Sequence, residues 1–187
     1  MTVTIIGIDP DTTTTGICYV TASAGADGLP LIHSMSMTLA RAEGDRAEDR
    51  LPLMADAIEA AVAARHADHV VIERQHVRPR DPNPNSLMPV QAVFGAALAA
   101  ARRCGVHFSR DRGEIHYKRA TVDMPIPSEW KGTIPKKKHQ PRILQACATY
   151  GLAVQEHSYL NVPPSLREHC VDALGMCLWL LRGRRIS

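Results

Sequence analysis

Aromatic residues are scarce in this 187-residue chain, where Phe, Trp and Tyr make up only 4% of the positions. Ala, Val, Leu and Ile must therefore fill most of the core, and a hydrophobic fraction of 45% is sufficient for one. No uncharged apolar run approaches the roughly 20 residues that a membrane-spanning helix needs. The N-terminus lacks the basic start and apolar segment of a signal peptide. These absences predict a cytoplasmic protein, and the length of the chain predicts a single domain over residues 1–187.

Paired cysteines are also missing. The chain has five cysteines, an odd number, and no two of them have C-x-x-C spacing. A disulfide framework or a structural zinc site is therefore not expected. We predict buried free thiols in a reducing compartment for Cys18, Cys104, Cys147, Cys170 and Cys177.

The first 20 residues combine a buried strand with an acidic end. Val3, Ile5, Ile6 and Ile8 form a nearly continuous apolar run, which is typical of a strand buried on both faces. Asp9 follows it, and a carboxylate there costs free energy unless it meets a cation or hydrogen-bond donors. Residues 12–16 suit a tight turn and residues 17–21 a second strand paired with the first. The alternative for Asp9 is a solvated turn residue.

A second apolar strand ends in the same way. Residues 48–66 repeat apolar side chains at helical spacing, and the short strand 70–72 follows, ended by Glu73. In open α/β sheets, ligands bind at the carboxyl edge of the strands. Both strands therefore deliver a carboxylate to the edge where a site is expected.

The last helix carries a third acid. Ser165 is a candidate N-cap for a helix through about Leu181. His169 and Asp172 are three residues apart and so share one face of this helix. The sequence around Asp172 is apolar on nearly every side, where an isolated charge is costly. Asp172 is therefore either a structural residue or the third acid of a cluster with Asp9 and Glu73.

The rest of the chain completes an α/β pattern. We expect strands at 31–39, 106–108 and 120–124, helices at 90–104 and 140–150, a proline-rich loop at 74–89, a charged excursion at 110–118 with a hairpin around Arg112–Gly113, and a basic irregular segment at 125–138. The Ala-rich helix 90–104 is either a dimer interface or a helix buried against the sheet.

Three converging carboxylates would repel one another, and hard divalent cations relieve such repulsion. Mg²⁺ and Mn²⁺ favour oxygen ligands. Two such ions, roughly 3.5–4 Å apart, can activate water and stabilise the leaving oxygen in phosphodiester hydrolysis. His169 would be a ligand, or would position or deprotonate the water.

Three motifs follow one another along the chain: I-I-G-I-D-P with the Thr-rich turn and Gly16, V-V-I-E, and H-C-V-D-A-L. Taken in this order, they resemble the RuvC family of Holliday-junction resolvases, and particularly its divergent phage-type members. The resemblance implies a ribonuclease H-like fold, with a five-stranded mixed β-sheet flanked by α-helices on both faces. It also implies a homodimer that nicks four-way DNA junctions with Mg²⁺ or Mn²⁺. The acidic positions of the family correspond to Asp9, Glu73 and Asp172, and His169 falls where some members have a fourth acid and others a histidine.

The chain departs from the family at several positions. Asp11 replaces the usual Gly after Asp-Pro, and we expect it to serve the turn. Where many members have an aromatic residue that touches the junction, this chain offers Arg74, Gln75 and His76. The excursion at 110–119 and the segment from Trp130 to Lys138 are longer than in typical bacterial members.

Basic residues supply candidate DNA contacts, because Lys and Arg bind phosphates without reading sequence. The alternative for each is a solubilising surface charge. Trp130 would either stack on a base or pack in the core, and we favour the core. The candidates are Arg74, His76, Arg78, Arg80, Lys131, Lys136, Lys137 and Lys138.

Two other functions are alternatives to a metal-dependent, structure-selective endonuclease. The stretch G-I-D-P-D-T-T-T-T-G resembles the first phosphate loop of actin-like ATPases and sugar kinases, but those proteins need two such domains and 187 residues are too few. A module that binds branched DNA without cutting it would not need the three acids. We therefore predict a nuclease.

Overall fold

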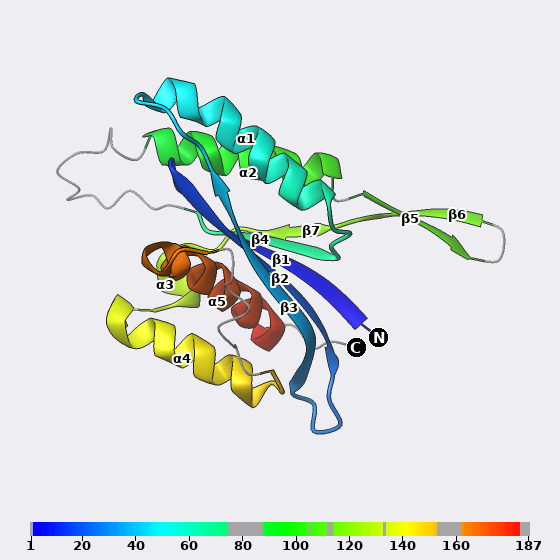
Figure 1. Cartoon of the computed structure of the whole chain (residues 1–187). Helices are drawn as coiled ribbons and strands as arrows, with labels where there is room; N and C mark the ends of the chain where they lie inside the picture. The colour runs from blue at the N-terminus through cyan, green and yellow to red at the C-terminus, as the bar shows by residue number, and fades with distance from the viewer. Residues whose placement is uncertain are drawn as a thin grey trace.

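The computed structural model places a five-stranded sheet between two layers of helices (Figure 1). It describes residues 2–74, 88–104, 106–111, 114–132, 134–152 and 162–183. The strands are β1 (Thr2–Asp9), β2 (Thr14–Ala24), β3 (Pro30–Arg41), β4 (His69–Ile72), β5 (Val106–Asp111), β6 (Glu114–Arg119) and β7 (Thr121–Asp123). The helices are α1 (Ala47–Ala63), α2 (Met88–Cys104), α3 (Pro127–Trp130), α4 (Lys136–Thr149), the 3₁₀ turn η3 (Pro164–Leu166) and α5 (Arg167–Gly183).

The sheet is mixed, as the resemblance to the family implies. Its strand order is β3-β2-β1-β4-β7. The first three strands form an antiparallel meander, whereas β4 runs parallel to β1 and β7 runs parallel to β4. The parallel pairing of β1 with β4 brings the carboxyl ends of these two strands to the same edge of the sheet.

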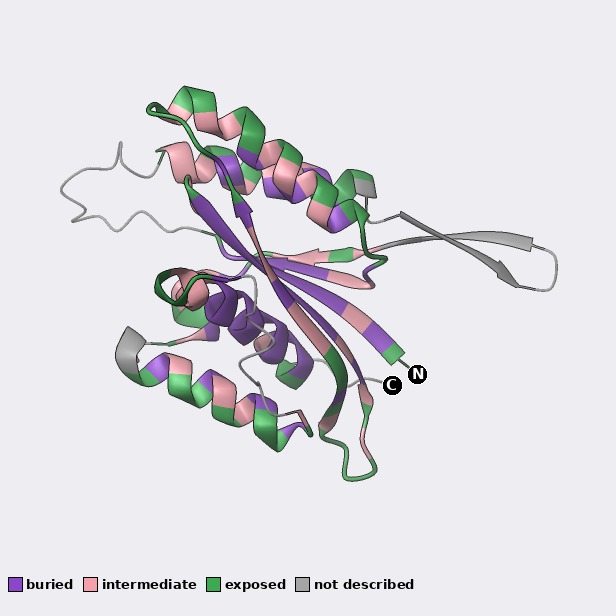
Figure 2. Ribbon diagram, viewed as in Figure 1, coloured by how far each residue is buried: buried purple, intermediate pink, exposed green. Residues whose placement is uncertain are grey.

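Alternate residues of β1 serve two separate cores. Ile6 and Ile8 belong to the core under α1 and α2, while Val3 and Ile5 belong to the core under α4 and α5. Figure 2 shows the buried strands between these layers and the nearly complete burial of α5. Because strand residues alternate between faces, Asp9 lies on the same face as Ile5, the face that α5 covers.

Two glycines in the central strands let α5 lie directly on the sheet. A Cβ atom on Gly7 would come within 2.2 Å of the carbonyl oxygen of Ala173, and one on Gly16 would come within 2.2 Å of the carbonyl oxygen of His169. Any side chain at either position would force the helix away from the strands. The glycines thus set the height of α5 above the end of β1, where Asp9 is.

The structure corrects two boundaries. Lys136, Lys137 and Lys138 form the first turn of α4 and are not part of an irregular segment, because the helix begins at Lys136, before the predicted residue 140. Ser165 is not an N-cap, because it lies inside η3 and α5 follows from Arg167.

The predicted strand at 106–108 and the charged excursion after it belong to one unit. Strands β5 and β6 pair in a two-stranded ribbon that is separate from the main sheet and extends away from it, and residues 112 and 113 between them lie outside the described residues (Figure 1). Cys18, Cys147, Cys170 and Cys177 are buried free thiols, as predicted, whereas the side chain of Cys104 lies outside the described residues. Among the described residues, no helix combines the length and apolar character needed to cross a lipid bilayer.

Candidate active site

Three carboxylates from distant parts of the chain are buried near one edge of the sheet. Asp9 ends β1, Glu73 follows β4, and Asp172 lies on α5. Their exposed fractions are 8%, 3% and 5%. Ile8 of β1 pairs with Ile72 of β4, and the backbone N–H of Glu73 donates to the carbonyl oxygen of Ile8 at 3.1 Å. Strand pairing therefore places Asp9 and Glu73 one residue beyond the same pair. We call Asp9, Glu73 and Asp172 the carboxylate cluster.

His169 is held against Asp9. Its Nδ1 lies 3.2 Å from Oδ2 of Asp9, and both side chains are mostly buried. The close contact between Gly16 and the first turns of α5 positions His169 above β2, whose Gly16 pairs with Asp9 in the sheet. This hydrogen bond to Asp9 is the main cause that raises the pKa of His169, with burial acting in the opposite direction.

Glu73 and Asp172 share a cation from the chain itself. The Nζ atom of Lys131 lies 3.5 Å from Oε2 of Glu73 and 3.8 Å from Oδ2 of Asp172. The indole Nε1–H of Trp130 also donates to Oε2 of Glu73 at 2.9 Å. The sequence makes Lys131 a candidate DNA contact, and the structure instead directs its side chain to the carboxylate cluster.

Burial dominates the electrostatics of the cluster. It raises the pKa of Asp9, against the lowering effect of the hydrogen bond from His169. It also raises the pKa of Glu73, and here the charge of Lys131 is the largest opposing influence. Glu73 further raises the pKa of Asp9, and Asp172 that of Glu73, so the carboxylates act on one another. Mutual repulsion of buried carboxylates is the condition that a bound cation relieves.

The donor set formed by the carboxylate cluster and His169 suits a hard divalent cation. Carboxylate oxygens with one imidazole are ligands that Mg²⁺ or Mn²⁺ accepts. A cationic nitrogen already contacts two of the three carboxylates, which indicates that the site attracts positive charge. Within the described ranges, no three His, Cys, Asp or Glu side chains are grouped closely enough to hold an ion.

Asp11 belongs to the turn, as predicted. Its Oδ1 accepts hydrogen bonds from the backbone N–H and the hydroxyl of Thr13, both at 3.0 Å. Its own N–H donates to Oγ1 of Thr15. Asp11 thus shapes the loop that follows Asp9.

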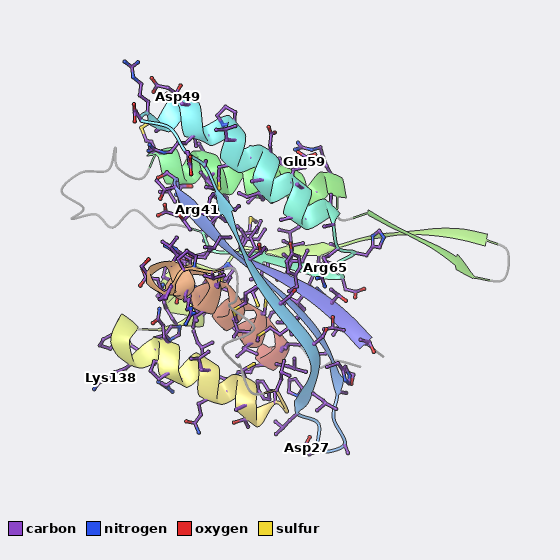
Figure 3. All side chains as sticks on the ribbon, viewed as in Figure 1. Asp27, Arg41, Asp49, Glu59, Arg65 and Lys138 are labelled. Atoms are coloured by element: carbon purple, nitrogen blue, oxygen red, sulfur yellow. The ribbon has the colours of Figure 1, made fainter. Side chains whose placement is uncertain are left out.

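The candidate DNA contacts divide into three groups. Arg74 is exposed immediately after Glu73, where its backbone N–H donates to the carbonyl oxygen of Pro125. Lys138 is exposed on the first turn of α4 and projects away from the sheet (Figure 3). His76, Arg78 and Arg80 lie outside the described residues, as do the side chains of Lys136 and Lys137.

The sequence predicts a core position for Trp130 but not its polar contact. Only 9% of Trp130 is exposed, which confirms that it is buried. Its indole N–H donates a hydrogen bond to Glu73. A signal is present in the sequence, because a buried Trp N–H must find an acceptor and Glu73 is the expected buried acceptor. The sequence also assigns Gly16 to a turn, and this is wrong, because β2 already begins at Thr14. Gly16 lies in that strand, where it pairs with Asp9 and makes room for α5.

Comparison with known protein families finds a match over more than half of the chain. A family model described as Crossover junction endodeoxyribonuclease RuvC matches residues 5–122. No curated protein is significantly similar to the chain in sequence.

Solved structures share the fold. Thermus thermophilus RuvC in complex with a Holliday junction substrate is 19% identical, with a TM-score of 0.65 over 97% of this chain and 95% of that one. Another T. thermophilus RuvC structure is also 19% identical, with a TM-score of 0.61 over 98% and 96%. The yeast mitochondrial Holliday junction resolvase Ydc2 is 14% identical, with a TM-score of 0.50 over 97% and 81%.

Proposed function

The chain belongs to the RuvC family of crossover junction endodeoxyribonucleases, and we propose that it resolves four-way DNA junctions by hydrolysing phosphodiester bonds at the carboxylate cluster. The observation that supports this site is the burial of Asp9, Glu73 and Asp172 at the edge where β1 and β4 end. Such burial is costly for groups that serve only the fold, and it is expected where cations are bound.

The family is metal-dependent, and we propose two Mg²⁺ or Mn²⁺ ions as the cofactors here. When bound, such ions activate the attacking water and stabilise the leaving oxygen. Asp9, Glu73 and Asp172 would hold them. The strand pairing that fixes Asp9 beside Glu73, and the glycine contacts that fix α5, would keep these oxygens in place.

His169 would act with Asp9. The contact between its Nδ1 and Oδ2 of Asp9 fixes the orientation of the ring. In the neutral ring, Nδ1 carries the proton that is shared with Asp9. Nε2 is then the atom that would bind a metal ion or take a proton from water. His169 is therefore assigned as a fourth ligand or as the base.

The DNA partner and the oligomer belong to the same proposal. A four-way junction carries two equivalent strands to be cut, which a homodimer would serve with one site in each subunit. The outer side of α2, on which Gly95 faces open space, is the candidate contact between subunits. Phosphate contacts from Arg74, Lys138 and their basic neighbours would hold the junction. We further propose that the chain forms one domain and that the protein acts in the cytoplasm.

The test is cleavage of labelled four-way junctions, flaps and linear duplex with Mg²⁺, with Mn²⁺ and with chelator. Asp9→Asn, Glu73→Gln and Asp172→Asn should each abolish nicking while junction binding persists. Asp56→Asn, on the exposed side of α1, is the matched control and should cut normally. A non-cleaving junction binder would bind without nicking under every metal condition. Wild-type cleavage rates in all three variants would show that the site is elsewhere.

A further inference from the structure

Lys131 contacts two members of the carboxylate cluster at once. Its nitrogen bridges Glu73 and Asp172 at 3.5 Å and 3.8 Å. The side chain of Lys131 is 27% exposed, whereas the side chains of Glu73 and Asp172 are only 5% and 7% exposed. Ion pairs with partners this deeply buried are screened far less by water than surface pairs.

The local fold directs this lysine to the cluster. Trp130 ends α3 and is anchored by burial and by its hydrogen bond to Glu73. Gly175 of α5 provides the space for the indole, because a Cβ atom there would meet the ring of Trp130 at 2.5 Å. The backbone N–H of Lys131 closes α3 on Pro127, and its ammonium group lies 4.8 Å from the centre of the Trp130 ring.

The ammonium group and a divalent ion would need the same oxygens. Oε2 of Glu73 and Oδ2 of Asp172 face Lys131, and a metal ligated by these residues would need their lone pairs. Two positive charges in one buried site would also repel each other.

Resting on the proposed metal site, we infer that Lys131 is the resident cation of the metal-free protein and that a divalent ion must displace it from Glu73 and Asp172. Lys131 is then a positioning residue with two effects. It stabilises the folded protein when no metal is bound, and it weakens metal binding by competition. Metal binding and the release of Lys131 are linked in one equilibrium. Lys131 therefore weakens metal binding by the same factor by which the metal weakens the contacts of Lys131 with the carboxylates.

The test compares Lys131→Met with the wild type in the absence of DNA. Methionine keeps an unbranched side chain but removes the charge. The variant should melt at a lower temperature than the wild type in chelator, because two buried carboxylates lose their counter-ion. It should bind Mn²⁺ at least about fivefold more tightly in calorimetric titration, because no ammonium group has to leave.

Two further variants separate charge from packing. Lys131→Arg retains the charge and should restore the metal-free melting temperature without tightening Mn²⁺ binding. Lys138→Met removes an equal charge from the exposed first turn of α4. It should leave Mn²⁺ binding unchanged, and it should leave the metal-free melting temperature unchanged or slightly higher. Glu73→Gln removes a proposed metal ligand and should abolish the heat of Mn²⁺ binding at the carboxylate cluster. The heat that is lost in this variant is therefore the part that belongs to the cluster.

Several results would overturn the inference. Equal or weaker Mn²⁺ binding by Lys131→Met, at a signal that Glu73→Gln removes, rejects displacement and leaves the proposed nuclease site intact. An unchanged metal-free melting temperature rejects the stabilising role. Mn²⁺ binding that is absent from both proteins, or insensitive to Glu73→Gln, rejects the metal site and the inference together.

Discussion

Nδ1 of His169 and Oδ2 of Asp9 lie 3.2 Å apart, although 160 residues separate them in the chain. The hydrogen bond raises the pKa of His169, so the ring binds its proton more tightly in the folded protein than in the unfolded chain. The contact therefore stabilises the fold below the ordinary pKa of 6.5, and that contribution is lost as the pH rises through the raised pKa.

Asp9→Asn should lower the pKa of His169, because an amide gives the imidazolium no negative partner. The measurement is an NMR titration of the ring nitrogens of His169. Asp11→Asn is the matched control, because Asp11 acts on His169 only through weaker charge attraction and should produce a smaller change. An unchanged titration of His169 in Asp9→Asn would show that the two side chains do not interact in solution.

Gly16→Ala should destabilise the protein and disturb the site together. The added methyl group would meet the backbone of α5 at His169, which cannot move as a flexible side chain would. Overpacking of this kind costs about 1–3 kcal/mol, measurable by urea unfolding, and the His169 resonances should shift in the same variant.

Gly183→Ala is the control for that measurement. Gly183 is the last residue of α5, and a Cβ atom added there would have nothing within 4 Å of it. Alanine at this position should therefore be neutral or stabilising by up to about 1 kcal/mol through helix propensity. Equal stability of Gly16→Ala and wild type would mean that α5 does not lie on the strands as described.

The positions of the acids were predictable because each follows a simple local rule. Apolar runs identify β1 and β4 as buried strands, and Asp9 and Glu73 are the first charged residues after them. Asp172 stands out because its neighbours on α5 are apolar. Strand order, however, depends on pairing between distant segments, so no local pattern of residues determines it. The sheet as a whole was indicated only by the resemblance to the family.

The position of Lys131 was not predictable in the same way. The segment 125–138 contains prolines and a lysine run, which favour an irregular structure. The structure instead forms the short helix α3, whose N-terminus is capped by Glu129: its carboxylate accepts the N–H of Ile126 at 2.8 Å. The predicted start of α4 at residue 140 is also too late, because the helix begins at Lys136 and Pro141 lies inside it. Whether Lys131 faces DNA or the cluster depends on these tertiary details.

Replacement of Lys136, Lys137 and Lys138 by Ala should weaken junction binding without destabilising the fold. Positive side chains in the first turn of α4 are unfavourable for the helix dipole, so their removal should leave stability unchanged or raise it slightly. If each contacts a phosphate, the slope of log K against log salt should fall by about 0.9 per lysine. An unchanged salt slope would remove these lysines from the interface.

His139 provides a test of the layer between α4 and α5. It is 7% exposed, and its ring meets the edge of Trp130 with 5.0 Å between centroids. Burial lowers the pKa of His139, and the nearby charges of Lys131 and Arg142 lower it further. The folded protein therefore resists protonation of this ring, whereas the unfolded chain accepts the proton near the ordinary value of 6.5.

Stability should consequently fall as the pH drops through 6.5 toward the lower pKa of folded His139, because in that window the unfolded chain binds more protons. His139→Phe keeps a ring against Trp130 but cannot titrate. Its free energy of unfolding, measured in urea over a pH series, should rise relative to wild type as the solution becomes more acidic. His169 is present in both proteins, so its opposite pH dependence cancels from the difference. Parallel stability curves for the two proteins would show that His139 is not held neutral by this layer.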